Sequence, residues 1–274
     1  MRKRLIATVL GAGLIGMLAL AAPASAAPAN GTVYVVHGIP GATVDVYVNG
    51  TKTLPSFAPG TVAGPLSLAP ASYAIKIFAA GADPTSATPV ISASVTLPAG
   101  ANVSLVANVD ANGKPTLSTF VNDTTAAAAG KGRLVVRHTA AAPAVDVLAN
   151  GSPAFTKLVN GNEAKADLAA GTISASVVAT GTTTPALIGP ANVTVTAGMA
   201  TVVYAIGAPA TGSVASTLGV ITQQIPLAGA AMVVQSGTAG LLDHGHAPAW
   251  AVAGLAIAAL GLSVSGWAVA RARS

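Results

Sequence analysis

Apolar and polar residues alternate with a period of two through most of the chain, which is the pattern of a half-buried β-strand. In residues 44–48, VDVYV, the three valines fall on one face, and the aspartate and tyrosine fall on the other. The same alternation recurs at residues 73–77, 91–97 and 103–109, between residues that favour turns. Before residue 247, no stretch keeps the helical i, i+3, i+4 pattern for three turns. The pattern therefore predicts an all-β fold.

The strand pattern occurs twice along the chain. Residues 33–50 read VYVVHGIPGATVDVYVNG, and residues 134–151 read LVVRHTAAAPAVDVLANG. The polar residues shared at an offset of 101 are His37 and His138, Asp45 and Asp146, and Asn49 and Asn150. We expect a duplicated unit of about 95 residues, with roughly seven or eight short strands in each copy. Such units suit tandem antiparallel β-sandwiches of the immunoglobulin-like or transthyretin-like kind, although strand spacing alone does not separate a sandwich from a barrel.

The repeat sets the expected domain boundaries. We expect a first β-sandwich at residues 31–123 and a second at residues 133–224. The small and polar stretch TTAAAAGKG, residues 124–132, is the expected linker. Residues 225–246 have no clear strand pattern and are expected to form a stalk.

The N-terminal residues have the order of a secretory signal peptide. Basic residues open the chain, an apolar segment follows, and a small-x-small pattern precedes residue 27. We therefore expect residues 1–26 to be removed on export. The alternative interpretation is an N-terminal anchor that is not cleaved.

The C-terminal residues are typical of a membrane anchor. Residues 247–270 carry no charge, and as a helix they would extend about 36 Å, enough to cross a hydrocarbon core of about 30 Å. Trp250 and Trp267 lie near the two ends of this segment, where interfacial rings are expected. The tail at residues 271–274 contains two arginines. The positive-inside rule then predicts a single-pass protein of the cell membrane, with an extracellular ectodomain and a cytoplasmic C-terminus.

The net charge of +5 comes from the two ends of the chain. Five of the 13 basic residues lie in residues 1–26 and 271–274. The region between them carries eight basic and eight acidic residues, so a nucleic-acid partner is not expected. The chain has no cysteine, which excludes disulfides and thiol catalysis.

The repeated pairs His37/Asp45 and His138/Asp146 are the candidate ligand-binding residues. A histidine and an aspartate on adjacent strands can bind a metal or act as acid and base, and they can equally hold turns in place. A metal site commonly needs three or four ligands, and each unit offers two. The chain also lacks the common catalytic and nucleotide-binding motifs. We therefore expect no catalytic residue, no metal site and no cofactor.

The first copy resembles a known family. The block VVH-x(7)-VDVYVNG, followed by strands beginning near Leu68-Ala-Pro-Ala-Ser-Tyr and Leu97-Pro-Ala-Gly, is similar to the bacterial domain-of-unknown-function family 4397. The likeness extends over residues 31–224 and is clearest in the first copy. The second copy departs from the pattern at Arg137, where the first copy has valine. The resemblance implies tandem β-sandwich modules in exported or surface proteins, typical of actinobacteria, with no established activity.

Two hypotheses about function follow. The first is a non-enzymatic, membrane-anchored surface protein with a structural, binding or adhesion role at the cell envelope. Its partners would be the cytoplasmic membrane, through the C-terminal helix, and a cell-wall polymer or another surface protein. The second is a metal- or ligand-dependent binding protein or enzyme that uses His37/Asp45 and His138/Asp146.

Overall fold

The computed structural model describes residues 27–213 and 215–229. The expected signal peptide at residues 1–26 lies outside this part of the chain. So does everything from residue 230 on, which contains the expected membrane helix, the tail and most of the stalk. Within the described ranges, no helix is long and apolar enough to cross a membrane.

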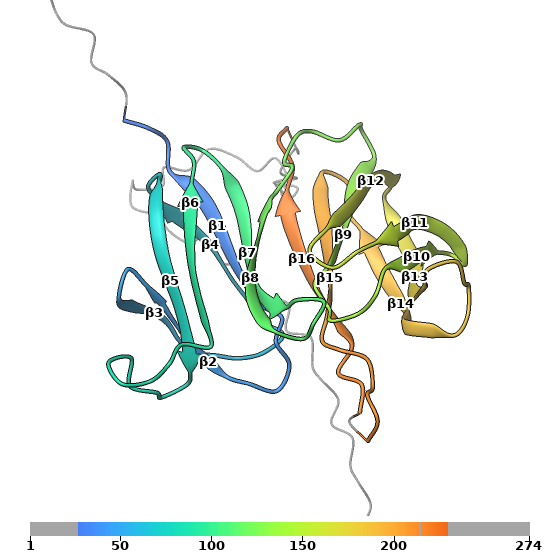
Figure 1. Ribbon diagram of the computed structural model, residues 1–274. Coiled ribbons are helices and arrows are strands. Elements are labelled where there is room, and N and C mark those ends of the chain that lie inside the picture. Colours follow the sequence, from blue (N-terminus) through green and yellow to red (C-terminus); the bar gives the residue numbers. More distant parts are fainter. Residues whose placement is uncertain (1–26, 214, 230–274) are drawn as a thin grey trace, which may run out of the picture. The chain divides into compact units, whose positions relative to one another are not determined.

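The first half of the described chain forms two four-stranded sheets (Figure 1). Its strands are β1 (Gly31–His37), β2 (Val44–Val48), β3 (Thr51–Phe57), β4 (Val62–Leu68), β5 (Ala71–Ala79), β6 (Ile91–Leu97), β7 (Asn102–Val109) and β8 (Pro115–Val121). One sheet has the order β4-β1-β7-β8 and the other the order β3-β2-β5-β6.

The second half repeats this arrangement. Its strands are β9 (Lys131–His138), β10 (Val145–Ala149), β11 (Ser152–Leu158), β12 (Glu163–Ala169), β13 (Gly171–Ala179), β14 (Ala186–Val195), β15 (Met199–Ile206) and β16 (Gly219–Pro226). The sheets have the orders β12-β9-β15-β16 and β11-β10-β13-β14, so each strand occupies the place of its counterpart in the first half. Strand β16 continues to Pro226, two residues beyond the expected end of the second unit at residue 224.

The all-β prediction is confirmed for the described residues, and the four sheets are consistent with two sandwich-like units. One detail differs from the expected antiparallel sheets. Strand β1 pairs with β7 in parallel, and β9 pairs with β15 in parallel. Short turns force neighbouring strands of a hairpin to run antiparallel, whereas several strands lie between the members of each parallel pair. The chain can therefore return in the same direction.

A separate apolar core lies between the two sheets of each unit. In the first unit, Val33 of β1 and Val103 of β7 pack with Ile77 of β5 from the facing sheet. In the second unit, Leu134 of β9 and Val177 of β13 belong to the equivalent core. Alternate residues of each strand fill these cores, as the period of two predicts.

A third apolar cluster joins the two units. It contains the side chains of β1, β7 and β8 that point away from the first core, and those of β9, β15 and β16 that point away from the second. Its fully buried members include Val36, Val106, Val202, Tyr204 and Ile225, each at most 1% exposed. The central strands of both units are thus buried on both faces, between the shared cluster and the core of their own unit.

Replacing Ile225 with alanine tests the contribution of this interface. Ile225 is completely buried in the third cluster. We expect Ile225→Ala to lower the free energy of unfolding by about 2–5 kcal/mol, because a large aliphatic side chain is removed from a close-packed interior. Urea denaturation gives the value. The exposed Thr222 lies on the same strand, and Thr222→Ala should change stability by less than about 0.5 kcal/mol. Equal effects of the two variants would contradict a packed interface.

Candidate functional site

The two histidines of the repeated motif end equivalent strands and are buried. His37 is the last residue of β1 and His138 the last residue of β9, and they are 0% and 1% exposed. Nε2 of His37 lies 2.7 Å from the carbonyl oxygen of Ala42, and Nε2 of His138 lies 3.0 Å from that of Pro143. A carbonyl oxygen only accepts hydrogen bonds, so Nε2 carries the proton in both rings. Each histidine therefore ties the end of its strand to the loop that follows.

Burial favours the neutral state of both rings. Nδ1 of His37 accepts a hydrogen bond from the backbone N–H of Ile39 at 3.3 Å. Nδ1 of His138 is buried and has no hydrogen-bond partner within the described residues. Burial lowers the pKa of both histidines below the ordinary value, because the charged ring would lose its hydration.

Asp45 binds a backbone amide within β3, another in the loop after β5, and one lysine. Its Oδ1 accepts the backbone N–H of Ser56 at 2.8 Å, and its Oδ2 accepts the backbone N–H of Gly81 at 3.1 Å. The ammonium group of Lys52 donates to Oδ2 at 2.7 Å. Lys52 first, and then the two amides, lower the pKa of Asp45 to about 2. The carboxylate is therefore charged at neutral pH and has its oxygens engaged.

Asp146 repeats the amide contacts of Asp45. It accepts the backbone N–H groups of Lys157 at 2.7 Å and Gly181 at 2.8 Å, and these amides lower its pKa. Ser56 and Lys157 both have a positive φ, at 46° and 55°, where strand pairing with β2 and β10 shifts register. Each aspartate thus satisfies the amide that a β-bulge leaves outside the sheet pairing.

Each histidine and its aspartate therefore serve different loops. In the described part of the chain, no hydrogen bond or ion pair joins His37 to Asp45 or His138 to Asp146. The same part contains no group of three His, Cys, Asp or Glu side chains arranged to hold a metal ion. The hydrogen bonds of these four residues position backbone segments at one end of each unit. Ligand binding by these four residues stays a prediction.

A second polar cluster lies where the two units meet, and sequence analysis did not select it. Its centre is Arg137 of β9, which is 1% exposed. Its Nε donates to Glu163 at 2.9 Å, its Nη1 to the hydroxyl of Tyr204 at 2.9 Å, and its Nη2 to Oδ1 of Asn122 at 2.7 Å. Its Cζ also lies 4.5 Å from the centre of the Phe120 ring. Asn122 and Phe120 come from the first unit, so one guanidinium group bonds across the junction.

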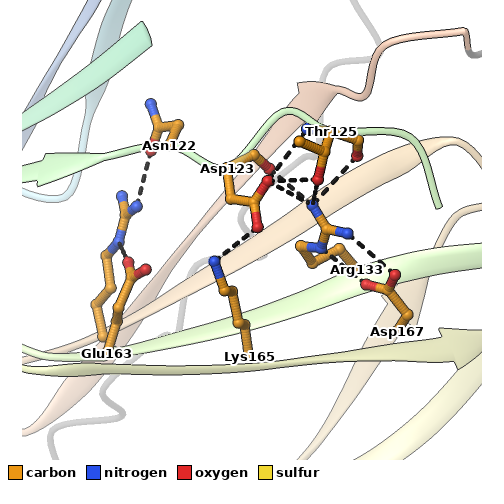
Figure 2. Close-up of polar contacts among 8 residues, drawn as sticks. Asn122, Asp123, Thr125, Arg133, Glu163, Lys165 and Asp167 are labelled. Carbon is orange, nitrogen blue, oxygen red and sulfur yellow. Dashed lines mark hydrogen bonds and ion pairs between the residues drawn. The ribbon is translucent and has the colours of Figure 1, made fainter. Parts of the chain in front are cut away.

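The start of the expected linker is fixed to the second unit by Arg133 (Figure 2). Arg133 forms a two-point ion pair with Asp167, at 2.7 and 3.0 Å, and this pair lowers the pKa of Asp167. Its Nη1 donates to the carbonyl oxygens of Asp123 and Thr125 at 3.1 and 3.2 Å. Lys165 donates to Asp123 at 2.6 Å and, as the largest cause, holds the pKa of that carboxyl far below its usual range.

The sequence carried a signal for this cluster. Glu163, Lys165 and Asp167 alternate along β12, and Glu163 and Asp167 stand directly opposite Arg137 and Arg133 in the pairing with β9. Charges that alternate with a period of two on adjacent strands lie on one face of a sheet. The burial of Arg133 and Arg137 could not be read from the pattern, because it depends on the first unit covering that face.

Residues 31–148 match the model of a protein family described as DUF4397, a domain of unknown function. This segment belongs to the DUF4397 family. The DUF4397 segment begins with β1 and ends within β10, so it contains the whole first unit and both His/Asp pairs. The resemblance was expected over residues 31–224, and the match does not extend beyond residue 148. A comparison with curated proteins found no match.

Replacing Arg137, which lies within the DUF4397 segment, tests the junction cluster. We expect Arg137→Ala to lower the free energy of unfolding by about 3–5 kcal/mol, because it leaves buried acceptors without their charged donor. Lys165, which is 44% exposed, is the matched control, and Lys165→Ala should cost at most about 1 kcal/mol. Chemical denaturation measures both. An Arg137→Ala protein as stable as the control would contradict the bonding across the junction.

Because the two histidines are buried, we expect the protein to lose stability in mild acid. Their pKa values are lowered in the folded protein, so below the ordinary value of about 6.5 the unfolded chain binds protons that the folded chain does not. The free energy of unfolding should therefore fall as the pH drops from 7.5 to 5. In the double variant His37→Gln, His138→Gln this decline should be smaller. Thermal denaturation at a series of pH values measures it, and equal slopes in both proteins would contradict the assignment.

Proposed function

We propose that the protein is a non-enzymatic surface protein of a bacterial cell envelope, anchored in the membrane by one C-terminal helix. The proposal rests on one observation, which is that the four candidate residues make structural contacts within their own unit. His37, Asp45, His138 and Asp146 are all engaged in contacts that hold loops of their own unit. The groups best suited to chemistry thus serve the fold, which favours a role in structure or binding.

The ends of the chain support the location. A leader at residues 1–26 and an uncharged segment at 247–270 followed by arginines are typical of an exported, single-pass protein. The ectodomain would then face outward, with the C-terminus in the cytoplasm. The family resemblance favours an actinobacterial source.

The junction between the units supports a role in presenting a surface. The apolar cluster and Arg137 join the two units, and Arg133 fixes the linker next to them. A partner therefore meets the two units in a fixed relation, without an ordering cost for the linker. A cell-wall polymer with a repeating structure, or another surface protein, is the kind of partner that two linked modules can engage together.

The experiment follows the full chain, expressed in a bacterium, through cell fractionation and protease treatment of intact cells. We expect it in the membrane fraction, solubilised by detergent, with residues 27–229 open to added protease. A chain that ends at residue 246 lacks the proposed anchor, so it should appear in the medium. Recovery of the full chain from the cytosol, or from the wall in a form that detergent does not release, would contradict the proposal.

The purified full chain is then mixed with isolated wall polymers and with divalent metals, and its melting temperature is followed. Stabilisation by a polymer supports the binding role. Stabilisation by a metal that disappears in His37→Gln, while the variant remains folded, would favour the metal-dependent hypothesis instead.

A further inference from the structure

The core of the first unit encloses an apolar cavity of about 120 Å³ between its two sheets. All but two of the residues around it are aliphatic, and the exceptions are Thr53 and Tyr73. The hydroxyl of Tyr73 donates to the carbonyl oxygen of Ala69 at 2.7 Å, so its ring faces the core and its polar end is used elsewhere. The cavity wall exposes apolar atoms and no polar ones.

The second unit provides a comparison within the same chain. The equivalent space between its sheets has a volume of about 40 Å³. Some of its side chains are smaller, with Ala175 in place of Ile75 and Ala154 in place of Thr53. Two others are larger, because Leu134 stands in place of Val33 and Phe155 stands in place of Leu54. The larger side chains and the course of the strands together leave less space in the second unit.

One difference in strand pairing lies next to the cavity. The pairing of β4 with β1 is interrupted between Val33 and Val35, where Gly64 and Pro65 form a bulge in β4. Gly64 has a φ of 120°, and a Cβ atom there would lie 2.7 Å from the carbonyl oxygen of Val33. The equivalent strands β12 and β9 pair without interruption. Bulges commonly bend their strand, and this one lies in the edge strand whose Leu66 and Leu68 line the cavity.

The cavity lies nearest to the surface along this edge. Leu54 of β3 and Leu66 and Leu68 of β4 line it and are half-buried, whereas lining residues on the central strands, such as Val33, are buried. Strands β3 and β4 are the edge strands of the two facing sheets. A guest would therefore enter between these two edges.

We propose that the first unit binds one small apolar guest in this cavity, a hydrocarbon group of about six carbons. An apolar cavity of about 150 Å³ in another protein stays dry and binds benzene, so the volume here suits a guest of that class. A polar guest is excluded because it would find no hydrogen-bond partner in the wall. The guest can be a free small molecule or the end of a lipid chain, since both present the same chemistry. The proposal does not depend on the function proposed above.

The test uses the full chain in lipid nanodiscs with labelled Leu and Val methyl groups, observed by NMR. In one experiment benzene is added. In the other, the nanodisc lipid carries a spin label at the end of its acyl chain. We expect saturable benzene shifts, or broadening by the spin label, confined to methyl groups around the first cavity such as those of Val46, Leu54 and Leu66. Benzene shifts without broadening identify a free molecule, and broadening identifies a lipid chain.

Two reciprocal variants control the test. Phe155 occupies the position in β11 that Leu54 occupies in β3, because each is paired with the equivalent valine of the neighbouring strand. Leu54→Phe therefore introduces a side chain that the fold accepts at this position, and it should weaken binding at least ten-fold while the melting temperature is retained. Phe155→Leu should leave binding in the first unit unchanged. The proposal is overturned if neither probe affects the first cavity, if both units respond equally, or if folded Leu54→Phe binds as the parent does.

Discussion

The burial of one sheet of each unit against the other is the constraint on which the rest of the structure depends. Strands β1 and β7 contribute to the core of the first unit with one face and to the shared cluster with the other, and β9 and β15 do the same in the second unit. A unit of this size is marginally stable alone, since it buries only somewhat more than about 60% of its unfolded surface. The shared cluster adds apolar burial that neither unit can obtain by itself. In a chain without cysteine, such burial takes the place of disulfides.

Arg137 gives this interface an orientation. Apolar contacts are not directional, but a buried guanidinium group must have its donors satisfied. Glu163, Tyr204 and Asn122 accept from it in one geometry, and Asn122 belongs to the other unit. A shifted interface would break the bond to Asn122 and leave a buried donor of the guanidinium group without an acceptor, which is costly. In the first unit valine stands at the equivalent position, Val36, so the junction is asymmetric although the strand orders are alike.

The repeated His and Asp residues have a structural explanation that does not involve chemistry between them. Each pair recurs because each unit has the same loop after β1 or β9 and the same bulge in β3 or β11. A buried imidazole that donates to a loop carbonyl, and a carboxylate that accepts bulge amides, satisfy backbone groups that the sheets leave unpaired. Duplication of the fold therefore requires duplication of these residues.

The sequence by itself determined the secondary structure and the division into two similar halves. The alternation in β2, β5, β6 and β7 and the offset between His37 and His138 are local or periodic features, and strands follow from them directly. Only the tertiary structure determined what packs against each face of those strands. The parallel pairing of β1 with β7, the burial of Arg137 and the cavity of the first unit depend on contacts between residues far apart in the chain. A period of two reports that a face is apolar or charged, and only the folded chain determines whether a sheet, another unit or solvent covers it.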